Sequence, residues 1–427
     1  MEEKFLHFIW KFQLLQNYPL TTIDGKIVEV LNQGDWNQNE SGPDFSCAKI
    51  KIGNKIWVGN VELHIYSSDW NRHQHSRDKA YSSIILHVVL NHDSEIEMLN
   101  EQQIPTLELK KFISPEIIES YKTLLKIETS FIPCEKNIRL IQKEKLNLWL
   151  ERIVLGRIER KSKEVESAFL YTGKNWEALL FRRLAYAFGL KINAEAFEVW
   201  ANSFEYSVLQ KVQKKPELVY ALFFGQAGFL EFSSSDDYII KLQKDYAFLK
   251  NKYKLTPLNS AVFKFFRLYP ASFPTVRMMQ LATLYTVYPN LFMFLMGSKS
   301  ADKIYPVFKE LHYPKFWENH YTFEKESSKK AQKQITDDLI NRIIINVIIP
   351  MKYIYGKMLG IDIITELLEL LYFLPPEKNT VLEKFKKIGI KPENALESQA
   401  LLEMKKHFCD EKKCLNCAIG LQVLKNV

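Results

Sequence analysis

The residue types best suited to chemistry gather in the first quarter of the chain. Asp44, preceded by Pro43, stands before one expected strand, and Glu62 and His64 stand two positions apart in the next. Side chains two apart on a strand project from the same face, so that face would carry an acid and a base. A Gly-Asn turn between the strands would return Asp44 to the side of Glu62. The pattern predicts a carboxylate pair with a histidine beside it.

Two carboxylates at one point suit a hard divalent cation. Mg²⁺ takes oxygen ligands, keeps several waters, and is commonly held by one or two carboxylates together with a substrate phosphate. We therefore expect Asp44 and Glu62 to ligate Mg²⁺ or Mn²⁺. His64 would orient or deprotonate the attacking water while the cation stabilises charge on the phosphate. The expected reaction is hydrolysis of phosphodiester bonds in DNA or RNA.

A polar segment and the strand after it offer a different set of ligands. The candidates are Asp69, His73, His75, Asp78 and His87. The histidines of the polar segment could join His64 around Zn²⁺, Fe²⁺ or Mn²⁺, which makes a metal hydrolase acting on a small substrate an alternative. The plainer interpretation is a connector with solvated histidines, in which Asp69 caps a helix and His87 is a hydrogen-bonded core residue.

The cysteines form a second candidate metal site. Four of the five in the chain are Cys134, Cys409, Cys414 and Cys417. The last three follow a C-x₄-C-x₂-C spacing, which suits thiolate ligation of zinc or of an iron–sulfur cluster. Cys134 would supply a fourth ligand if the chain end folds back, and His407 is the alternative for zinc. Free reduced thiols are the plainer interpretation.

Arginines in the middle of the chain offer a surface for nucleic acid. They are Arg182, Arg183, Arg267 and Arg277. Each lies close in sequence to aromatic residues, as in surfaces that bind phosphates or single strands, although core packing explains the aromatics more economically. The chain contains no phosphate-binding loop with a Lys-Ser/Thr signature, no G-x-S-x-G elbow and no Rossmann fingerprint. Nucleotide hydrolysis, serine hydrolysis and dinucleotide redox chemistry are therefore disfavoured.

The elements that must position these residues change character along the chain. Residues 3 to 16 repeat large apolar side chains at helical spacing. Strand patterns follow in residues 26 to 31, 46 to 52, 55 to 65 and 83 to 90. Helical periodicity dominates from about residue 113, with proline-bearing breaks between helices.

These patterns predict an α+β protein. We expect a small N-terminal α/β domain with a mixed sheet over residues 1 to 112, a large all-α domain over residues 113 to 403, and a basic, cysteine-bearing tail over residues 404 to 427 packed on the body. At 427 residues and 47% hydrophobic content, the chain is long enough for two or three such parts.

Charge is distributed unevenly between these parts. Residues 1 to 112 carry 11 Lys and Arg against 15 Asp and Glu, a net charge of −4, and the remainder carries 47 against 35, a net charge of +12. An acidic site beside a basic body suits a metal centre served by a phosphate-attracting surface. The odd cysteine number and the short apolar runs indicate a reducing compartment and no membrane span, so we expect a cytoplasmic protein.

Two resemblances extend this interpretation. Pro43-Asp44, an intervening strand and Val61-Glu62-Leu63-His64 resemble the core of the PD-(D/E)XK nucleases, whose order of helix, three strands, helix and strand is similar to the expected one. The resemblance implies a restriction-endonuclease-like fold, Mg²⁺ binding by Asp44 and Glu62, and water activation at position 64. That family has lysine there, and histidine can be neutral near pH 7 and is shorter in reach. An alternative is therefore a non-catalytic scaffold that binds nucleic acid or protein.

The chain as a whole also resembles an uncharacterised bacterial family known only as a domain of unknown function. The segments that carry this resemblance are residues 42 to 45, 59 to 64, 68 to 70 and 267 to 277 together with the terminal cysteines. It implies no activity.

Overall fold

The chain folds into two compact units. The computed structural model describes residues 2–16, 18–37, 41–126 and 130–425. Unit 1 contains residues 1–149, 387–390 and 404–427, and unit 2 contains residues 150–386 and 391–403. The cysteine-bearing tail thus groups with the N-terminal sheet. The predicted domain boundaries after residues 112 and 403 stay predictions.

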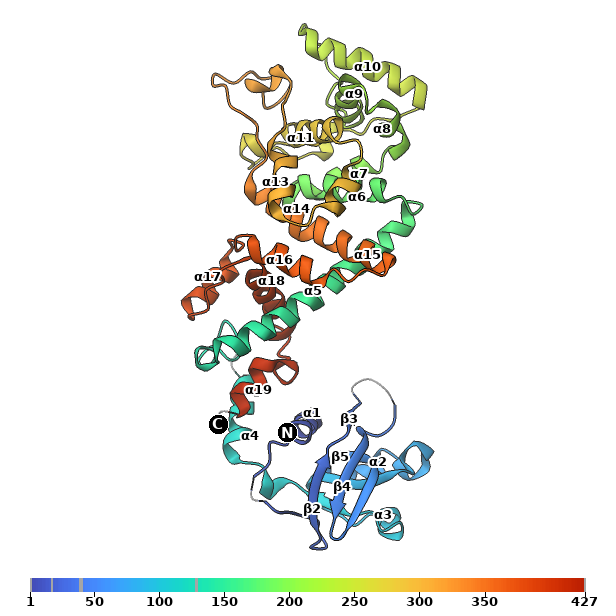
Figure 1. Ribbon diagram of the computed structural model, residues 1–427, viewed down its shortest axis with the longest axis vertical. Helices are drawn as coiled ribbons and strands as arrows, with labels where there is room; N and C mark the ends of the chain where they lie inside the picture. The colour runs from blue at the N-terminus through green and yellow to red at the C-terminus, as the bar shows by residue number, and fades with distance from the viewer. Residues whose placement is uncertain (1, 17, 38–40, 127–129, 426–427) are drawn as a thin grey trace. The chain divides into compact units, whose positions relative to one another are not determined.

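A mixed sheet dominates the first part of unit 1 (blue in Figure 1). Its strands are β1 (Leu20–Thr21), β2 (Ile27–Asn32), β3 (Asp35–Trp36), β4 (Phe45–Ile52), β5 (Lys55–Tyr66), β6 (Ile84–Asn91) and β7 (Thr106–Glu108). The strand order is β1-β2-β4-β5-β6-β7, with β3 paired to β4 outside this path. Pairs from β1 to β5 are antiparallel, whereas β5-β6 and β6-β7 are parallel. The predicted mixed sheet before a large helical region is confirmed.

Side-chain patterns explain where each strand lies. β4 alternates buried and more exposed residues, as expected for an antiparallel strand with one covered face. In β6, which has parallel neighbours on both sides, every residue except Asn91 is buried. Gly59 allows β5 to approach the start of β6, because a Cβ at this position would lie 2.4 Å from Ile85 Cγ2. A larger residue at position 59 would therefore push β5 away from the start of β6, next to the candidate site.

Several helices complete unit 1. They are α1 (Glu3–Phe12), α2 (Asp69–Arg72), α3 (Glu97–Glu101), α4 (Pro115–Lys126), α19 (Ala418–Lys425), the π-helical turn η9 (Lys405–Cys409), and the 3-10 turns η1 (His75–Arg77), η2 (Lys79–Tyr81), η3 (Lys110–Phe112), η4 (Ile138–Leu140) and η10 (Cys414–Asn416). α1 packs against β5 and buries Phe5, Phe8 and Ile9. α2 also packs against β5, and its Trp70 lies in a small core with Tyr81.

Unit 2 is helical (green to red in Figure 1). Its helices are α5 (Lys143–Tyr171, beginning in unit 1), α6 (Trp176–Phe188), α7 (Leu190–Ala201), α8 (Tyr206–Val212), α9 (Pro216–Gln226), α10 (Asp237–Tyr253), α11 (Pro274–Val287), α12 (Leu291–Gly297), α13 (Ala301–Lys309), α14 (Asp337–Ile343), the π-helical turn η8 (Ile344–Ile348), α15 (Ile349–Leu359), α16 (Ile364–Phe373), α17 (Thr380–Lys387, ending in unit 1) and α18 (Ala395–Met404, ending in unit 1). The 3-10 turns of this unit are η5 (Ser260–Val262), η6 (Pro270–Ser272) and η7 (Lys315–Glu318).

Two of the predicted proline breaks begin helices of unit 2. Pro216 and Pro274 each stand in the first turn, where the missing N–H costs no hydrogen bond. The core of this unit is rich in aromatic side chains, and the rings of Trp200 and Phe223 lie 4.8 Å apart. None of the helices in the described part of the chain combines the length and the hydrophobicity that a membrane span needs.

Candidate metal and catalytic site

The β4-β5 pairing brings Asp44 and Glu62 together, as the hairpin spacing predicts. Phe45 pairs with Val61, so the residue before β4 lies beside Glu62. The Asp44 N–H donates to Glu62 Oε2 (3.1 Å), and the Leu63 N–H donates to Asp44 Oδ2 (2.9 Å). A backbone N–H group thus holds one oxygen atom of each carboxylate, and the second oxygen atom of each is left for other partners.

α1 adds two residues that sequence reasoning missed. His7 Nε2 lies 3.2 Å from Asp44 Oδ2 and 3.7 Å from Glu3 Oε1. One ligand atom from each of Glu3, His7 and Asp44 lies within 4.8 Å of the others, which is close enough to share a metal ion. The available signal was the spacing of Glu3 and His7, one helical turn apart on the helix that precedes the sheet.

Histidines occupy the other side of Glu62. Glu62 Oε1 lies 3.2 Å from His75 Nε2 and 3.7 Å from His64 Nε2. His64 Nε2 lies 3.2 Å from His75 Nε2, and His64 Nδ1 lies 2.9 Å from His87 Nε2. His64, His73 and His75 form a second group whose ligand atoms lie within 4.8 Å of one another. Glu62 thus stands between a carboxylate-rich group and an imidazole group.

The two remaining secondary candidates shape the connector instead of joining this cluster. Asp69 is the first residue of α2, and its carboxylate accepts the Tyr66 N–H (3.0 Å) and pairs with Arg72 (2.8 Å). Asp78 is exposed, and its carboxylate accepts the Ala80 N–H (2.9 Å). Both therefore hold the backbone that carries His73 and His75.

Exposure falls from one side of the site to the other. The side chain of Glu3 is 37% exposed, that of Asp44 17%, that of Glu62 6% and that of His64 0%. Glu3, His7 and Asp44 line a cleft of about 990 Å³. Its other lining residues are Glu2, Lys4, Trp36, Asn37, Tyr121, Glu411, Lys412, Lys413, Leu415 and Asn416. A molecule in the cleft would meet Glu3 and Asp44 before the more deeply buried Glu62 and His64.

Burial sets the protonation of the inner residues. Burial and the neighbouring Asp44 carboxylate raise the pKa of Glu62 to about 9. Burial and the surrounding histidines lower the pKa of His64 to about 2, and burial lowers that of His87 to about 3. Near neutral pH, Glu62 therefore keeps a proton that a cation could displace, and the buried imidazoles are neutral.

His7 behaves in the opposite way. Burial opposes its charged form, but the hydrogen bond to Asp44 and the negative charges of Asp44 and Glu3 outweigh that effect and raise its pKa. The same burial raises the pKa of Glu3. The outer group thus consists of acids and a base whose protonation is linked, as in many sites that bind cations or transfer protons.

The predicted arginines differ in accessibility. Arg277 is buried and donates to Gln280 Oε1 (3.0 Å), so it is not part of the exposed basic surface that was expected. Arg182 and Arg183 line a small pocket of about 200 Å³, and Arg183 donates to the Glu164 carbonyl (2.7 Å). Arg267 is exposed and lies over the Phe266 ring, 5.1 Å from its centroid.

The four predicted cysteine ligands all belong to unit 1, and none forms a disulfide. Cys134 precedes η4, Cys409 ends η9, and Cys414 begins η10, three residues before Cys417. His407, the alternative zinc ligand, has its Nδ1 3.4 Å from Glu411 Oε1.

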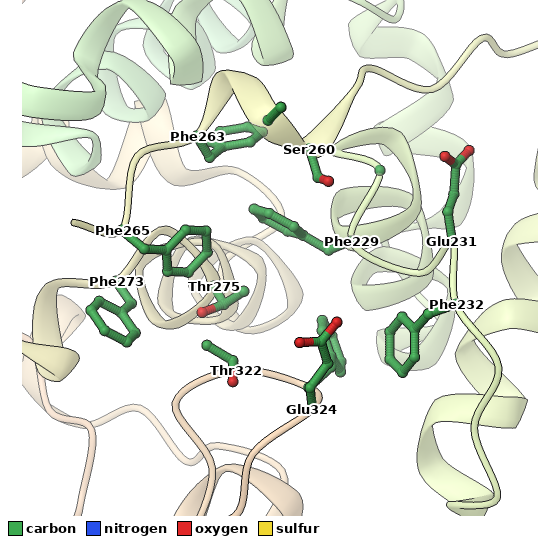
Figure 2. Close-up of a pocket in the computed structure, with 13 residues that line it drawn as sticks. Phe229, Glu231, Phe232, Ser260, Phe263, Phe265, Phe273, Thr275, Thr322 and Glu324 are labelled. Carbon is green, nitrogen blue, oxygen red and sulfur yellow. The ribbon is translucent and has the colours of Figure 1, made fainter.

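A second hollow lies in unit 2 and has different chemistry (Figure 2). It encloses about 520 Å³, and its aromatic lining consists of Phe229, Phe232, Phe263, Phe265, Phe273 and Phe323. Glu231 and Glu324 are its charged lining residues, and no histidine, cysteine or lysine is among the lining residues described. The pocket suits binding better than catalysis. Its phenylalanines are scattered between residues 229 and 323, so no sequence motif could have revealed it.

Comparison with known proteins places the chain in a family. No protein with a curated description and no solved structure matches it. A family model described as "Protein of unknown function (DUF2851)" matches residues 3–380, a range that contains Glu3, His7, Asp44, Glu62 and the histidine cluster. The chain therefore belongs to this family.

Proposed function

We propose that the protein is a metal-dependent nuclease that hydrolyses phosphodiester bonds of DNA or RNA. The observation that carries the proposal is the hydrogen-bonded pair of Asp44, which lines an open cleft, and the buried Glu62 beside it. A carboxylate pair of this kind is a common way to hold Mg²⁺ or Mn²⁺ beside a phosphate. The resemblance of Pro43-Asp44 and Glu62-x-His64 to the PD-(D/E)XK pattern supports the same reaction.

Asp44 and Glu62 would hold the cation, and Glu3 lies close enough to contribute a further oxygen. When bound, the cation would activate a water and stabilise negative charge on the phosphate. Binding would remove the proton from Glu62, because an ionised carboxylate is the ligand form. The elevated pKa of Glu62 thus makes cation uptake favoured by a rise in pH.

The proton-transfer role falls more naturally to His7 than to His64. A base works best when its pKa lies near the working pH, and the lowered pKa of His64 makes it a weak base. His7 lines the cleft and touches Asp44, and its pKa is raised. We therefore assign proton transfer to His7 and treat His64 as a positioning residue that packs behind Glu62.

Lysines on the cleft wall would attract the polyanion. Lys4 from α1 and Lys413 from the C-terminal tail both line the cleft. Lysine side chains contact phosphates without reading base sequence, so we expect binding that depends on salt and little on sequence.

Cleavage of labelled DNA and RNA with Mg²⁺ or Mn²⁺ tests the proposal. The wild type should cleave, and Asp44→Asn should not, whereas Asp78→Asn should retain activity because Asp78 is exposed and an asparagine can still accept the Ala80 N–H. Binding of nucleic acid with no cleavage by freshly purified wild type under either metal would favour the non-catalytic scaffold.

A second candidate function rests on the imidazole group of His64, His73 and His75. Three histidines with an open fourth position are a common catalytic site for zinc and related metals. His73 is exposed, so a small substrate could reach such an ion. This hydrolase would copurify with a transition metal. The variants His73→Ala and His75→Ala would lose the metal, and Asp44→Asn would keep both the metal and the activity.

A further inference from the structure

Two segments far apart in the sequence meet in unit 1 and carry four cysteines. The rings of Trp149 and Phe408 lie 5.4 Å apart, and Lys145 Nζ lies 3.2 Å from Gln422 Oε1. α4 also packs against α19. Lys405 Nζ also lies 5.2 Å from the centroid of the Phe131 ring, so the segment that contains Cys134 packs against the tail that contains Cys409, Cys414 and Cys417.

Three of the four thiols are buried, because Cys134, Cys414 and Cys417 are each 8% exposed. Burial raises the pKa of Cys134 to about 12 and that of Cys414 to about 11, and repulsion from other thiolates of the group adds to both shifts. Burial also raises the pKa of Cys409, and all three other cysteines contribute to the shift. All four are free thiols, so no disulfide explains why they gather.

N–H groups lie near one of these sulfurs and favour its ionised form. Burial raises the pKa of Cys417, but the backbone N–H groups of Gly420 and Ile419 and the indole of Trp149 lower it. The Trp149 Nε1–H is buried and has no conventional acceptor among the described residues. Donors aimed at a sulfur favour its ionised form, which is the form that binds metals. A protonated thiol offers them a weaker acceptor.

The backbone is built to hold this arrangement. A Cβ on Gly420 would lie 2.1 Å from the Cys414 carbonyl oxygen, so only glycine lets the chain close around Cys417. The Cys417 N–H donates to the Cys414 carbonyl (3.2 Å), which makes a tight turn between the two cysteines. A C-x₂-C turn of this kind presents two sulfurs to one metal.

We propose that Cys134, Cys409, Cys414 and Cys417 together bind a thiophilic metal centre, either a zinc ion or an iron–sulfur cluster. A cationic centre would remove the mutual repulsion of the four thiolates, and metal binding would release their protons. Because Cys134 is distant in sequence from the other three, the centre would link the tail to the segment that follows the sheet.

The centre would also hold one wall of the cleft. Residues 411 to 413, 415 and 416 line the cleft and lie between Cys409 and Cys417. Lys413 is held in this loop by its N–H, which donates to the Phe408 carbonyl (2.8 Å). This consequence rests on the proposed function, because the wall matters only if a substrate occupies the cleft. The proposal of the metal centre itself does not rest on the proposed function.

Elemental and sulfide analysis of protein purified without oxygen tests the centre. We expect either about one zinc per chain, or roughly four iron and four sulfide with a visible brown absorption. Cys414→Ser should lose the metal, and Cys47→Ser should keep it because Cys47 is exposed and outside the group. Protein free of both metals after expression with added zinc and iron would overturn the proposal.

Thiol alkylation of the wild type gives a test that needs no variant. In the native protein only Cys47 should react with iodoacetamide, and after treatment with a strong chelator the other four should react as well. The midpoint temperature of thermal unfolding should fall when the chelator removes the metal. If the four thiols stay unreactive after chelation and the midpoint temperature does not change, the four cysteines are buried but bind no metal. Neither readout depends on cleavage of nucleic acid.

Discussion

Unit 1 contains the two clusters of side chains for which we propose metal binding, and they differ in almost every physical respect. The carboxylate–histidine site has oxygen and imidazole ligands, and its exposure falls from Glu3 in the cleft to His64 in the interior. The cysteine group has sulfur ligands, and Cys134, Cys414 and Cys417 are each 8% exposed. Hard, partly hydrated ligands suit an ion that meets a substrate, whereas buried thiolates suit an ion that holds the chain.

The accessibility of each cluster indicates what a bound metal ion would do there. Asp44 directly precedes β4 and lines the cleft, so its carboxylate is within reach of water and of any molecule that enters the cleft. Cys417 is only 8% exposed, which leaves little room for exchange of a bound ion or its ligands. Variants of the open cluster should therefore change the reaction rate, and variants of the closed cluster should change stability.

The largest effect is expected at the carboxylate pair. Asp44→Asn or Glu62→Gln should lower the rate of cleavage by roughly 10³-fold or more, because loss of the ion removes several kcal/mol of transition-state stabilisation. Single-turnover cleavage of labelled duplex and single strands measures the change. Asp78→Asn is the matched control, and a loss in the control equal to that in Asp44→Asn would contradict the assignment.

The histidines provide the next contrast. His7→Gln should lower the rate by roughly 10²- to 10⁴-fold and remove one limb of the pH–rate profile, as expected for a group that transfers a proton. His64→Gln should lower the rate without removing a limb. The reverse pattern would return the proton-transfer role to His64.

The carboxylate pair and the coarse fold could be predicted from the sequence because both follow from local rules. The turn after β4 dictates which residues face each other, so Asp44 and Glu62 were found by counting along a hairpin. Period-two and helical patterns likewise indicated a mixed sheet before a helical region.

Residues brought together by tertiary packing could not be predicted in this way. Glu3 and His7 reach Asp44 only because α1 packs on β5, which no local pattern states. Arginine is usually a surface residue, but Arg277 is buried, and Gln280 and Ser272 accept hydrogen bonds from its two terminal nitrogens. The cleft wall formed by residues 411 to 416 depends on the return of the chain end.

A moderate effect is expected from pH in the metal-free protein. The folded chain keeps a proton on Glu62 up to a pKa of about 9, whereas the unfolded chain releases it near the ordinary value of 4.5. The free energy of unfolding should therefore fall as pH rises from about 7 to about 9, and the raised pKa of His7 acts in the same direction. The lowered pKa values of His64, His75 and His87 matter only below about 6.5, where they make stability rise with pH.

Thermal unfolding in a chelating buffer measures this dependence. Glu62→Gln should flatten the decrease between about pH 7 and 9, and saturating Mn²⁺ should flatten it in the wild type because the ion replaces the proton. A wild-type slope that neither change affects would mean that Glu62 is ionised in the metal-free fold.

The smallest effect is expected at the cleft lysines. Lys4→Gln and Lys413→Gln should each weaken nucleic-acid binding and lower the slope of log affinity against log salt by about one per lost phosphate contact. Arg277→Gln should leave the slope unchanged because Arg277 is buried, although it should lower the free energy of unfolding. Nucleic-acid titrations at several salt concentrations measure this slope for the three variants. Equal slopes in all three would mean that these lysines do not contact the nucleic acid.

A crystal structure of the protein soaked in Mn²⁺ tests the central claim most directly, because anomalous scattering locates the ion. We predict an ion bound by carboxylate oxygens of Asp44 and Glu62, with open positions facing the cleft. An ion bound only by His64, His73 and His75, or a carboxylate pair that stays empty at saturating Mn²⁺, would contradict it.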